Sequence, residues 1–184
     1  NNIAKFNAPL CDLWIEVLRQ VPDSRLRLKA KAFFDPEILL EWETRFTRAG
    51  IAKERLLFMP HKPQVKDHLA VYNEVDIALD SYPYHGTTTT CEALAAGVPV
   101  VSLAGSSHVA RVGVSLLNAV GLADLVAEQS EDYIAIAVKL AADRARLQQL
   151  RTSLGEDHSF TRDLVEDTFP NVTVSIARVE RSVA

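Results

Sequence analysis

Apolar residues follow two patterns along this chain, one with helical spacing and one of short, nearly continuous runs. The first helical pattern lies between residues 10 and 18, where apolar side chains recur at i, i+3, i+4, i+7 and i+8. Its members are Leu10, Leu13, Trp14, Val17 and Leu18. This stripe predicts an amphipathic helix with one face on a core, and Pro22 is expected to end it because the residue before a proline disfavours helix.

Similar stripes predict helices over residues 35–50, 66–73, 88–96, 110–119, 131–141 and 144–154. In the first of these, Asp35 and Pro36 suit the N-cap and first helical positions, and Gly50 suits the end. Strands are expected at 25–29, where apolar and polar residues alternate, at 55–59, 75–79 and 98–103, and more weakly at 122–127. The tail is expected to be helical from about residue 156, in two pieces separated by Pro170.

The alternation of strands with helices predicts the fold class. It is α/β, with a doubly wound parallel sheet of Rossmann-like type, because each parallel connection needs a crossover helix. We find no linker, low-complexity segment or internal repeat, so residues 1–184 are interpreted as one domain. In such folds ligands bind at the carboxyl ends of the strands, which directs attention to the loops there.

Composition narrows the classes of partner. The chain has 184 residues, 48% of them hydrophobic, which is enough for a core, and its net charge of -4 argues against a nucleic-acid footprint. Apolar stretches such as 93–103 are far shorter than the roughly 20 residues that cross a bilayer, so no membrane association is expected. Cys11 and Cys91 have no metal-type spacing, which favours a reducing, cytoplasmic location. The first residue is not Met, so we expect the chain to begin inside a longer polypeptide.

The candidate chemistry lies between residues 76 and 111. An apolar strand and a turn-rich loop lead to Gly86 and to four consecutive threonines, 87–90, at the expected start of a helix. The first N–H groups of a helix lack intrahelical acceptors and carry partial positive charge, so this position suits a phosphate. Glu92, one turn later, suits the hydroxyls of a ribose. The alternative is that one threonine caps the helix and the others are merely tolerated.

Several segments together resemble one family of enzymes. They are residues 76–80, 82–84, 86–92, 96–101 and 111–117. In that order they are similar to the C-terminal catalytic segment of the SPINDLY-type O-linked N-acetylglucosamine transferases, which follow TPR repeats. The resemblance implies the second domain of an inverting, two-domain GT-B glycosyltransferase that binds UDP-GlcNAc without a metal cofactor. It also implies a protein acceptor, bound through an upstream half and TPR repeats that this chain lacks.

The resemblance also assigns roles to single residues on the phosphate side of the donor. Lys5 matches the lysine that contacts the diphosphate and is the expected catalytic residue, and Asn2 matches a polar neighbour of the phosphate and sugar. Thr88 and Thr89 match the threonines at the helix start that bind the diphosphate, and Thr87 occupies a position where some members have histidine.

Other matched residues lie around the sugar and the nucleoside. His85 and Gly86 are expected beside the sugar, although His85 stands where asparagine is common. His68 matches a histidine beside the nucleoside, and the backbone near His61 would face the uracil. Glu92 matches an acidic residue on the ribose, where some members have the shorter aspartate.

Two further residues, His108 and Arg111, lie in a Gly/Ser loop that would contact the donor or the acceptor, unless Ser106 or Ser107 merely caps a helix. A metal site is not expected, because His61 and His68 lack a third ligand. Two alternatives remain open. One is a protein glucosyltransferase of the same superfamily that uses UDP-glucose, and the other is a UDP-sugar-binding module without catalysis.

Overall fold

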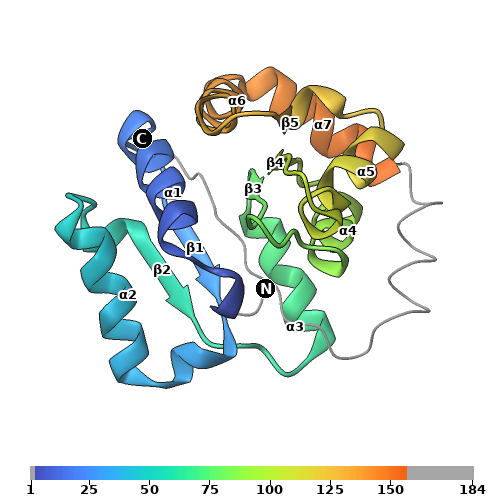
Figure 1. The fold of residues 1–184 in the computed structure, drawn as a ribbon. Coiled ribbons are helices and arrows are strands. Elements are labelled where there is room, and N and C mark those ends of the chain that lie inside the picture. The colour runs from blue at the N-terminus through green and yellow to red at the C-terminus, as the bar shows by residue number, and fades with distance from the viewer. Residues whose placement is uncertain (1–2, 157–184) are drawn as a thin grey trace.

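The computed structural model describes residues 3–156, which form an α/β fold with parallel strands (Figure 1). The strands are β1 (Leu26–Lys29), β2 (Leu56–Met59), β3 (Ala78–Leu79), β4 (Val100–Leu103) and β5 (Val126–Ala127). The α-helices are α1 (Ala8–Gln20), α2 (Pro36–Arg48), α3 (Val65–Ala70), α4 (Thr88–Ala95), α5 (Val112–Ala119), α6 (Ser130–Ala142) and α7 (Arg144–Glu156). The predicted α/β class and parallel pairing are therefore confirmed.

The strands form two parallel sheets, β1-β2 and β3-β4-β5, where the sequence predicts a single sheet. In the first, Leu26 pairs with Leu56 and Lys29 with Met59, and in the second, Ala78 pairs with Val100. Strand β3 covers only Ala78–Leu79, the two residues that pair with β4, so residues 75–77 of the expected strand are not part of it. The short β3 shares hydrogen bonds with β4, and no pairing joins β1 to β3 within residues 3–156.

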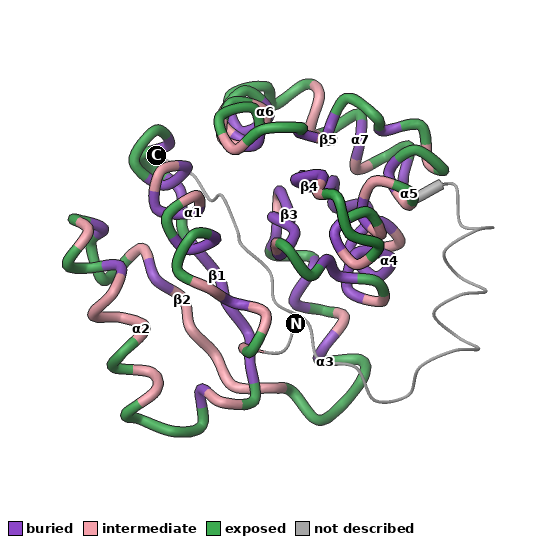
Figure 2. The backbone as a smooth tube through the Cα atoms, viewed as in Figure 1, coloured by how far each residue is buried: buried purple, intermediate pink, exposed green. Residues whose placement is uncertain are grey.

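Helices and buried side chains connect the two sheets. Helix α1 packs against α6, which also covers β4 and β5. At this contact Trp14 donates from Nε1 to the hydroxyl of Tyr133 at 3.3 Å, and that hydroxyl lies 3.2 Å from the backbone oxygen of Asp80, directly after β3. One cluster of buried apolar side chains includes residues of both sheets and of the helices around them. Figure 2 shows the buried segments along β1, β3, β4 and α4.

Most predicted elements occur within a few residues of their expected bounds, with three corrections. Strand β1 does not alternate, since all four of its residues are buried, including Lys29. The helix expected at 66–73 is divided into α3 and a 3-10 helix over Val71–Glu74. The helix expected from residue 110 begins at Val112, after a 3-10 turn over His108–Ala110. The expected helical tail lies outside the described residues beyond Glu156. No helix among residues 3–156 is long and apolar enough to span a membrane.

Both cysteines are buried as free thiols in this fold. Burial raises the pKa of Cys11 and of Cys91 to about 11. At pH 8 about one thiol in a thousand is then a thiolate, which is the reactive form. We expect reaction with a thiol reagent at pH 8 to be slow in the native chain and rapid after denaturation, as a spectroscopic thiol assay would measure. Rapid labelling of both residues in the native chain would contradict this burial.

Candidate functional site

The loop between β3 and α4 is organised by the carboxylate of Asp80. Its Oδ1 accepts hydrogen bonds from the N–H of Ser81 at 2.9 Å and of Gly86 at 2.8 Å, which closes the loop on itself. Its Oδ2 accepts from Ser102 Oγ at 2.7 Å, which ties the loop to β4. Burial raises the pKa of Asp80, while nearby His85 and the donors on Gly86, Ser102 and Ser81 lower it. The hydrogen bonds of this buried carboxylate therefore fix the conformation of the loop that leads into α4.

His85 lies inside the protein, with its side chain fully buried. Its Nδ1 accepts the N–H of Gly113 at 3.0 Å, so the proton is on Nε2, which donates to the backbone oxygen of Leu103 at 2.8 Å. Because both ring nitrogens are used, the ring does not face a ligand in this structure. The backbone oxygen of His85 accepts from Lys5, whereas its ring is held by Gly113 and Leu103, so a place for the ring beside the sugar stays a prediction that these contacts do not favour.

The ammonium group of Lys5 reaches this loop from the beginning of the chain. Its Nζ donates to the backbone oxygen of His85 at 3.0 Å and lies 4.1 Å from the centroid of the Tyr84 ring. Partial burial lowers the pKa of Lys5, and the charge of Asp80 opposes that effect. The lysine is 80 positions from His85 in sequence, yet the fold places its charge just before α4.

The four threonines differ in burial. Thr87 is exposed and Thr88 is half-buried, whereas Thr89 and Thr90 are buried. Thr90 donates from Oγ1 to the backbone oxygen of Gly86 at 3.0 Å, and a Cβ on Gly86 would collide with the hydroxyls of Thr89 and Thr90. The hydroxyls of Thr87 and Thr88 are therefore the accessible ones at the start of α4, and that of Thr89 packs beneath Gly86.

The structure brings His68 and Glu92, the residues expected beside the nucleoside, into direct contact. His68 Nε2 lies 3.2 Å from Glu92 Oε2, which also accepts from the hydroxyl of Tyr72 at 3.0 Å. His68 Nδ1 lies 2.8 Å from Nζ of Lys29, at the carboxyl end of β1. The ring of His61 is 6.1 Å from that of His68. Burial lowers the pKa of His61, and the positive charges nearby lower it further.

The remaining predicted residues are dispersed. His108 is exposed in its 3-10 turn, and Arg111 is exposed, with its Nη1 donating to the backbone oxygen of Gly105 at 3.2 Å. Asn2 lies outside the described residues. Among residues 3–156, no three His, Cys, Asp or Glu side chains gather in a way that would hold a metal ion.

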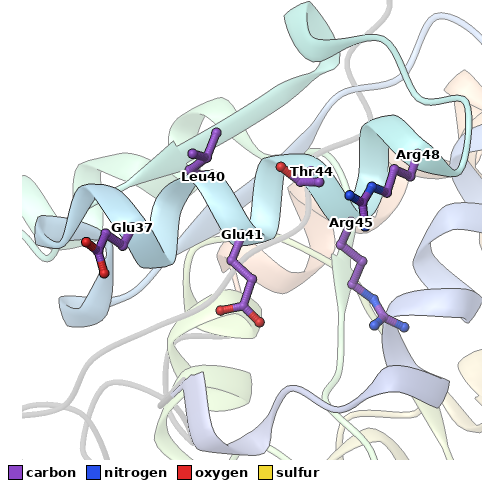
Figure 3. A pocket seen from close by; sticks show the side chains of 6 residues that line it. All are labelled: Glu37, Leu40, Glu41, Thr44, Arg45 and Arg48. Atoms are coloured by element: carbon purple, nitrogen blue, oxygen red, sulfur yellow. The ribbon is translucent and has the colours of Figure 1, made fainter.

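Hollows on the surface are only partly related to this site. One lies on α2, where Figure 3 shows side chains that all come from that helix and include none of the candidate residues. They are Glu37, Leu40, Glu41, Thr44, Arg45 and Arg48. Another, between α3 and α4, borders Glu92 and is lined further by Lys66, Leu69 and Asn73. Of these two hollows on the described part of the chain, the one between α3 and α4 reaches a candidate residue.

Sequence reasoning assigns no role to Lys29, Tyr72 or Asp80. A lysine within an apolar strand was a usable signal, since a charged side chain in such a strand needs a buried partner. Asp80 directly follows a predicted strand, which is also where ligand-binding loops begin. No local pattern points to Tyr72, because its contact with Glu92 spans 20 residues.

Known proteins resemble this chain in sequence. Residues 1–164 match the model of glycosyl transferase family 41. A rice protein named as a probable UDP-N-acetylglucosamine–peptide N-acetylglucosaminyltransferase SPINDLY is 44% identical over 84% of this chain, and its Arabidopsis thaliana counterpart is 43% identical. A Caenorhabditis elegans UDP-N-acetylglucosamine–peptide N-acetylglucosaminyltransferase is 29% identical. The match spans only 17% of the rice protein.

A solved structure is also similar. A mutant of the Thermobaculum terrenum O-GlcNAc transferase superposes with a TM-score of 0.79 and 38% identity, over 89% of this chain and 33% of that protein. The likeness therefore covers the lysine, the loop and the helix start described above, which lie within the matched residues 1–164. The family match covers most of the sequence, and the fold agrees with it. This chain belongs to glycosyl transferase family 41.

Proposed function

We propose that this chain is the donor-binding half of an inverting protein O-GlcNAc transferase that binds UDP-GlcNAc without a metal cofactor. One observation carries the proposal: Lys5 Nζ lies 3.0 Å from the backbone oxygen of His85, beside the start of α4. A fixed cation and a helix N-terminus thus face the same loop. Thr87, which is exposed, and Thr88, which is half-buried, would add hydroxyl donors for a diphosphate.

These groups suit the departure of a nucleoside diphosphate from a sugar. As the bond to C1 of the sugar breaks, negative charge grows on the diphosphate. The ammonium of Lys5 and the N–H groups at the start of α4 stabilise that charge more in the transition state than in the ground state. Because Asp80 and its hydrogen bonds fix the loop, little reorganisation is needed when the charge develops.

The nucleoside would lie on the side of His68 and Glu92. Glu92 is held by hydrogen bonds from Tyr72 and His68, so its carboxylate is pre-oriented to accept from ribose hydroxyls. The two ring nitrogens of His68 are already engaged by Lys29 and Glu92. His68 would therefore offer a ligand the edge or face of its ring, and the backbone near His61 would meet the base.

The rest of the reaction would depend on parts of the enzyme outside this chain. The chain spans 17% of the rice relative and 33% of the solved transferase. The binding site for the protein acceptor, the general base and any TPR repeats would therefore belong to the remainder of the enzyme. A GT-B active site lies between two domains, of which this chain would supply one. We therefore place the complete enzyme in the cytoplasm as a protein glycosyltransferase, with this chain inactive alone.

Binding measurements test the proposal directly. Calorimetry with excess EDTA is expected to show binding of UDP and UDP-GlcNAc, because Lys5 and α4 provide the positive potential that a metal ion would otherwise provide. Thr88→Val should weaken the binding of UDP by about tenfold or more and leave the binding of uridine unchanged, because a hydrogen bond to a charged acceptor contributes about 1.5–3 kcal/mol. GDP and UDP-glucose serve as competing ligands.

Each other outcome would revise a specific part. Binding only with magnesium or manganese would overturn the metal-free proposal. Tighter binding of GDP than of UDP would overturn the uridine assignment, and a preference for UDP-glucose would favour the glucosyltransferase. Equal weakening of UDP and uridine by Thr88→Val would place Thr88 away from the diphosphate.

A further inference from the structure

Lys29 is an unusual side chain for a protein interior. It is the last residue of β1, its side chain is fully buried, and it comes from the two-stranded sheet. Its Nζ lies 2.8 Å from His68 Nδ1 and 3.3 Å from the backbone oxygen of His68 in α3. The lysine therefore joins the first sheet to the segment that carries the candidate nucleoside residues.

The donor and acceptor properties of these groups determine where the protons are. A lysine ammonium can only donate, so His68 Nδ1 must accept and must lack a proton. The proton of the neutral ring is then on Nε2, which is 3.2 Å from Glu92 Oε2 and donates to it. This gives a continuous sequence of Lys29 ammonium, His68 imidazole and Glu92 carboxylate, with Tyr72 as a second donor to the carboxylate.

Retaining a lysine in this position is costly for the fold. Burial lowers the pKa of Lys29 to about 8, while the charge of Glu92 opposes that effect. The side chain remains mainly cationic at pH 7, and Glu92 balances it across the imidazole. An apolar residue would fill the same space without the desolvation cost, so packing alone does not account for a lysine here.

We propose that Lys29 is a positioning residue that holds His68 in its Nε2–H tautomer and, through His68, orients Glu92 toward the nucleoside of the donor. The part that concerns the nucleoside rests on the proposed function. The tautomer and the ring orientation follow from the contacts of the chain alone. Other titratable groups near His68 include the ring of His61 and the hydroxyl of Tyr72, which donates to Glu92.

Nitrogen NMR of the histidine rings tests the first part without any ligand. At pH 7 the ring of His68, assigned with a His68→Gln variant, should have an unprotonated Nδ1 and a protonated Nε2. Lys29→Met removes the donor that requires Nδ1 to accept, so the Nε2–H tautomer is no longer enforced and the Nδ1 signal should move toward the protonated position. Lys31→Met, a nearby exposed lysine, should leave the His68 signals unchanged.

The NMR result overturns the proposal in two ways. A protonated Nδ1 in the unsubstituted chain would show that Lys29 does not act as the donor, and this measurement holds even when Lys29→Met fails to fold. Unchanged His68 signals in a folded Lys29→Met chain would show that the lysine has only a packing role.

Calorimetry tests the second part. Lys29→Met should weaken the binding of UDP about tenfold, which corresponds to the loss of one hydrogen bond with a charged group, while the binding of inorganic pyrophosphate should not change. Lys31→Met is the matched control and should bind both ligands as the unsubstituted chain does. If the affinities for UDP and pyrophosphate fall equally, or if the affinity for UDP does not fall, the link to the nucleoside is overturned. Failure of the unsubstituted chain to bind UDP would instead overturn the proposed function, and the tautomer would still decide the role of Lys29.

Discussion

Replacing Lys5 by Met in the complete transferase proposed above is expected to lower kcat by about 100-fold or more, the usual cost of losing one electrostatic contact with developing charge. The KM for the donor should rise much less, because the lysine gains most of its interaction when the diphosphate leaves. The Lys5 ammonium is held by the backbone oxygen of His85 and lies against Tyr84, so its position is defined before the donor binds. Transfer of radiolabelled sugar from UDP-GlcNAc to an acceptor protein measures both constants.

Lys31→Met is the control for the Lys5 variant. It removes the same charge from an exposed position in the 3-10 helix after β1 and should leave kcat unchanged. A Lys5→Met enzyme with normal kcat, or an equal loss in both variants, would show that the charge of Lys5 does not act on the leaving group.

Gly113→Ala should destabilise the fold by about 3 kcal/mol, within the range for overpacking that also disrupts a buried hydrogen-bonded cluster. A Cβ on Gly113 would meet Ser102 Oγ, Asp80 Oδ2 and His85 Nδ1, which are the side chains that organise the β3–α4 loop. Gly113 lies in α5, where alanine would ordinarily be the better helix former by about 1 kcal/mol. Helix propensity and steric collision therefore predict changes of opposite sign in the free energy of unfolding. Urea unfolding followed by circular dichroism decides between them.

Gly121→Ala provides the matched glycine control. No atom lies within 4 Å of a Cβ built there, so only its positive φ of 73° opposes the substitution, at about 1–2 kcal/mol. A Gly113→Ala chain that is at least as stable as the unsubstituted one would mean that the cluster around Asp80 accommodates a methyl group.

Sequence reasoning identified the helices well because their apolar stripes are long. The stripe from Leu10 to Leu18 and the Asp35-Pro36 start both correspond to helices in the structure, and the side chain of Asp35 accepts the N–H of Glu37 as an N-cap does. The strands were less well defined. The apolar run 75–79 predicts a five-residue strand, but only Ala78 and Leu79 pair with β4, because pairing depends on a distant strand. The division into two sheets depends on hydrogen bonds between distant strands, which no local pattern encodes.

The candidate site was predictable where it depends on local sequence. The run of threonines indicates a helix start, and the structure begins α4 there, with Thr87 exposed and Thr88 half-buried. The sequence does not show which of these threonines are buried, because the path of the loop packs Thr89 under Gly86. The burial of the His85 ring and the contact of Lys29 with His68 are long-range as well, spanning 28 residues to Gly113 and 39 residues to His68.

The short segment before α1 has a consequence for anyone who excises this region as a separate protein. Asn7 caps α1 by accepting the N–H of Leu10, and its Nδ2 donates to the backbone oxygen of Tyr82 at 2.6 Å. Two residues before it, Lys5 holds the same loop at His85. A cleavage point chosen at the first regular helix, at Ala8, would remove both anchors while leaving every α-helix and strand intact. A boundary that keeps both contacts therefore lies before Lys5.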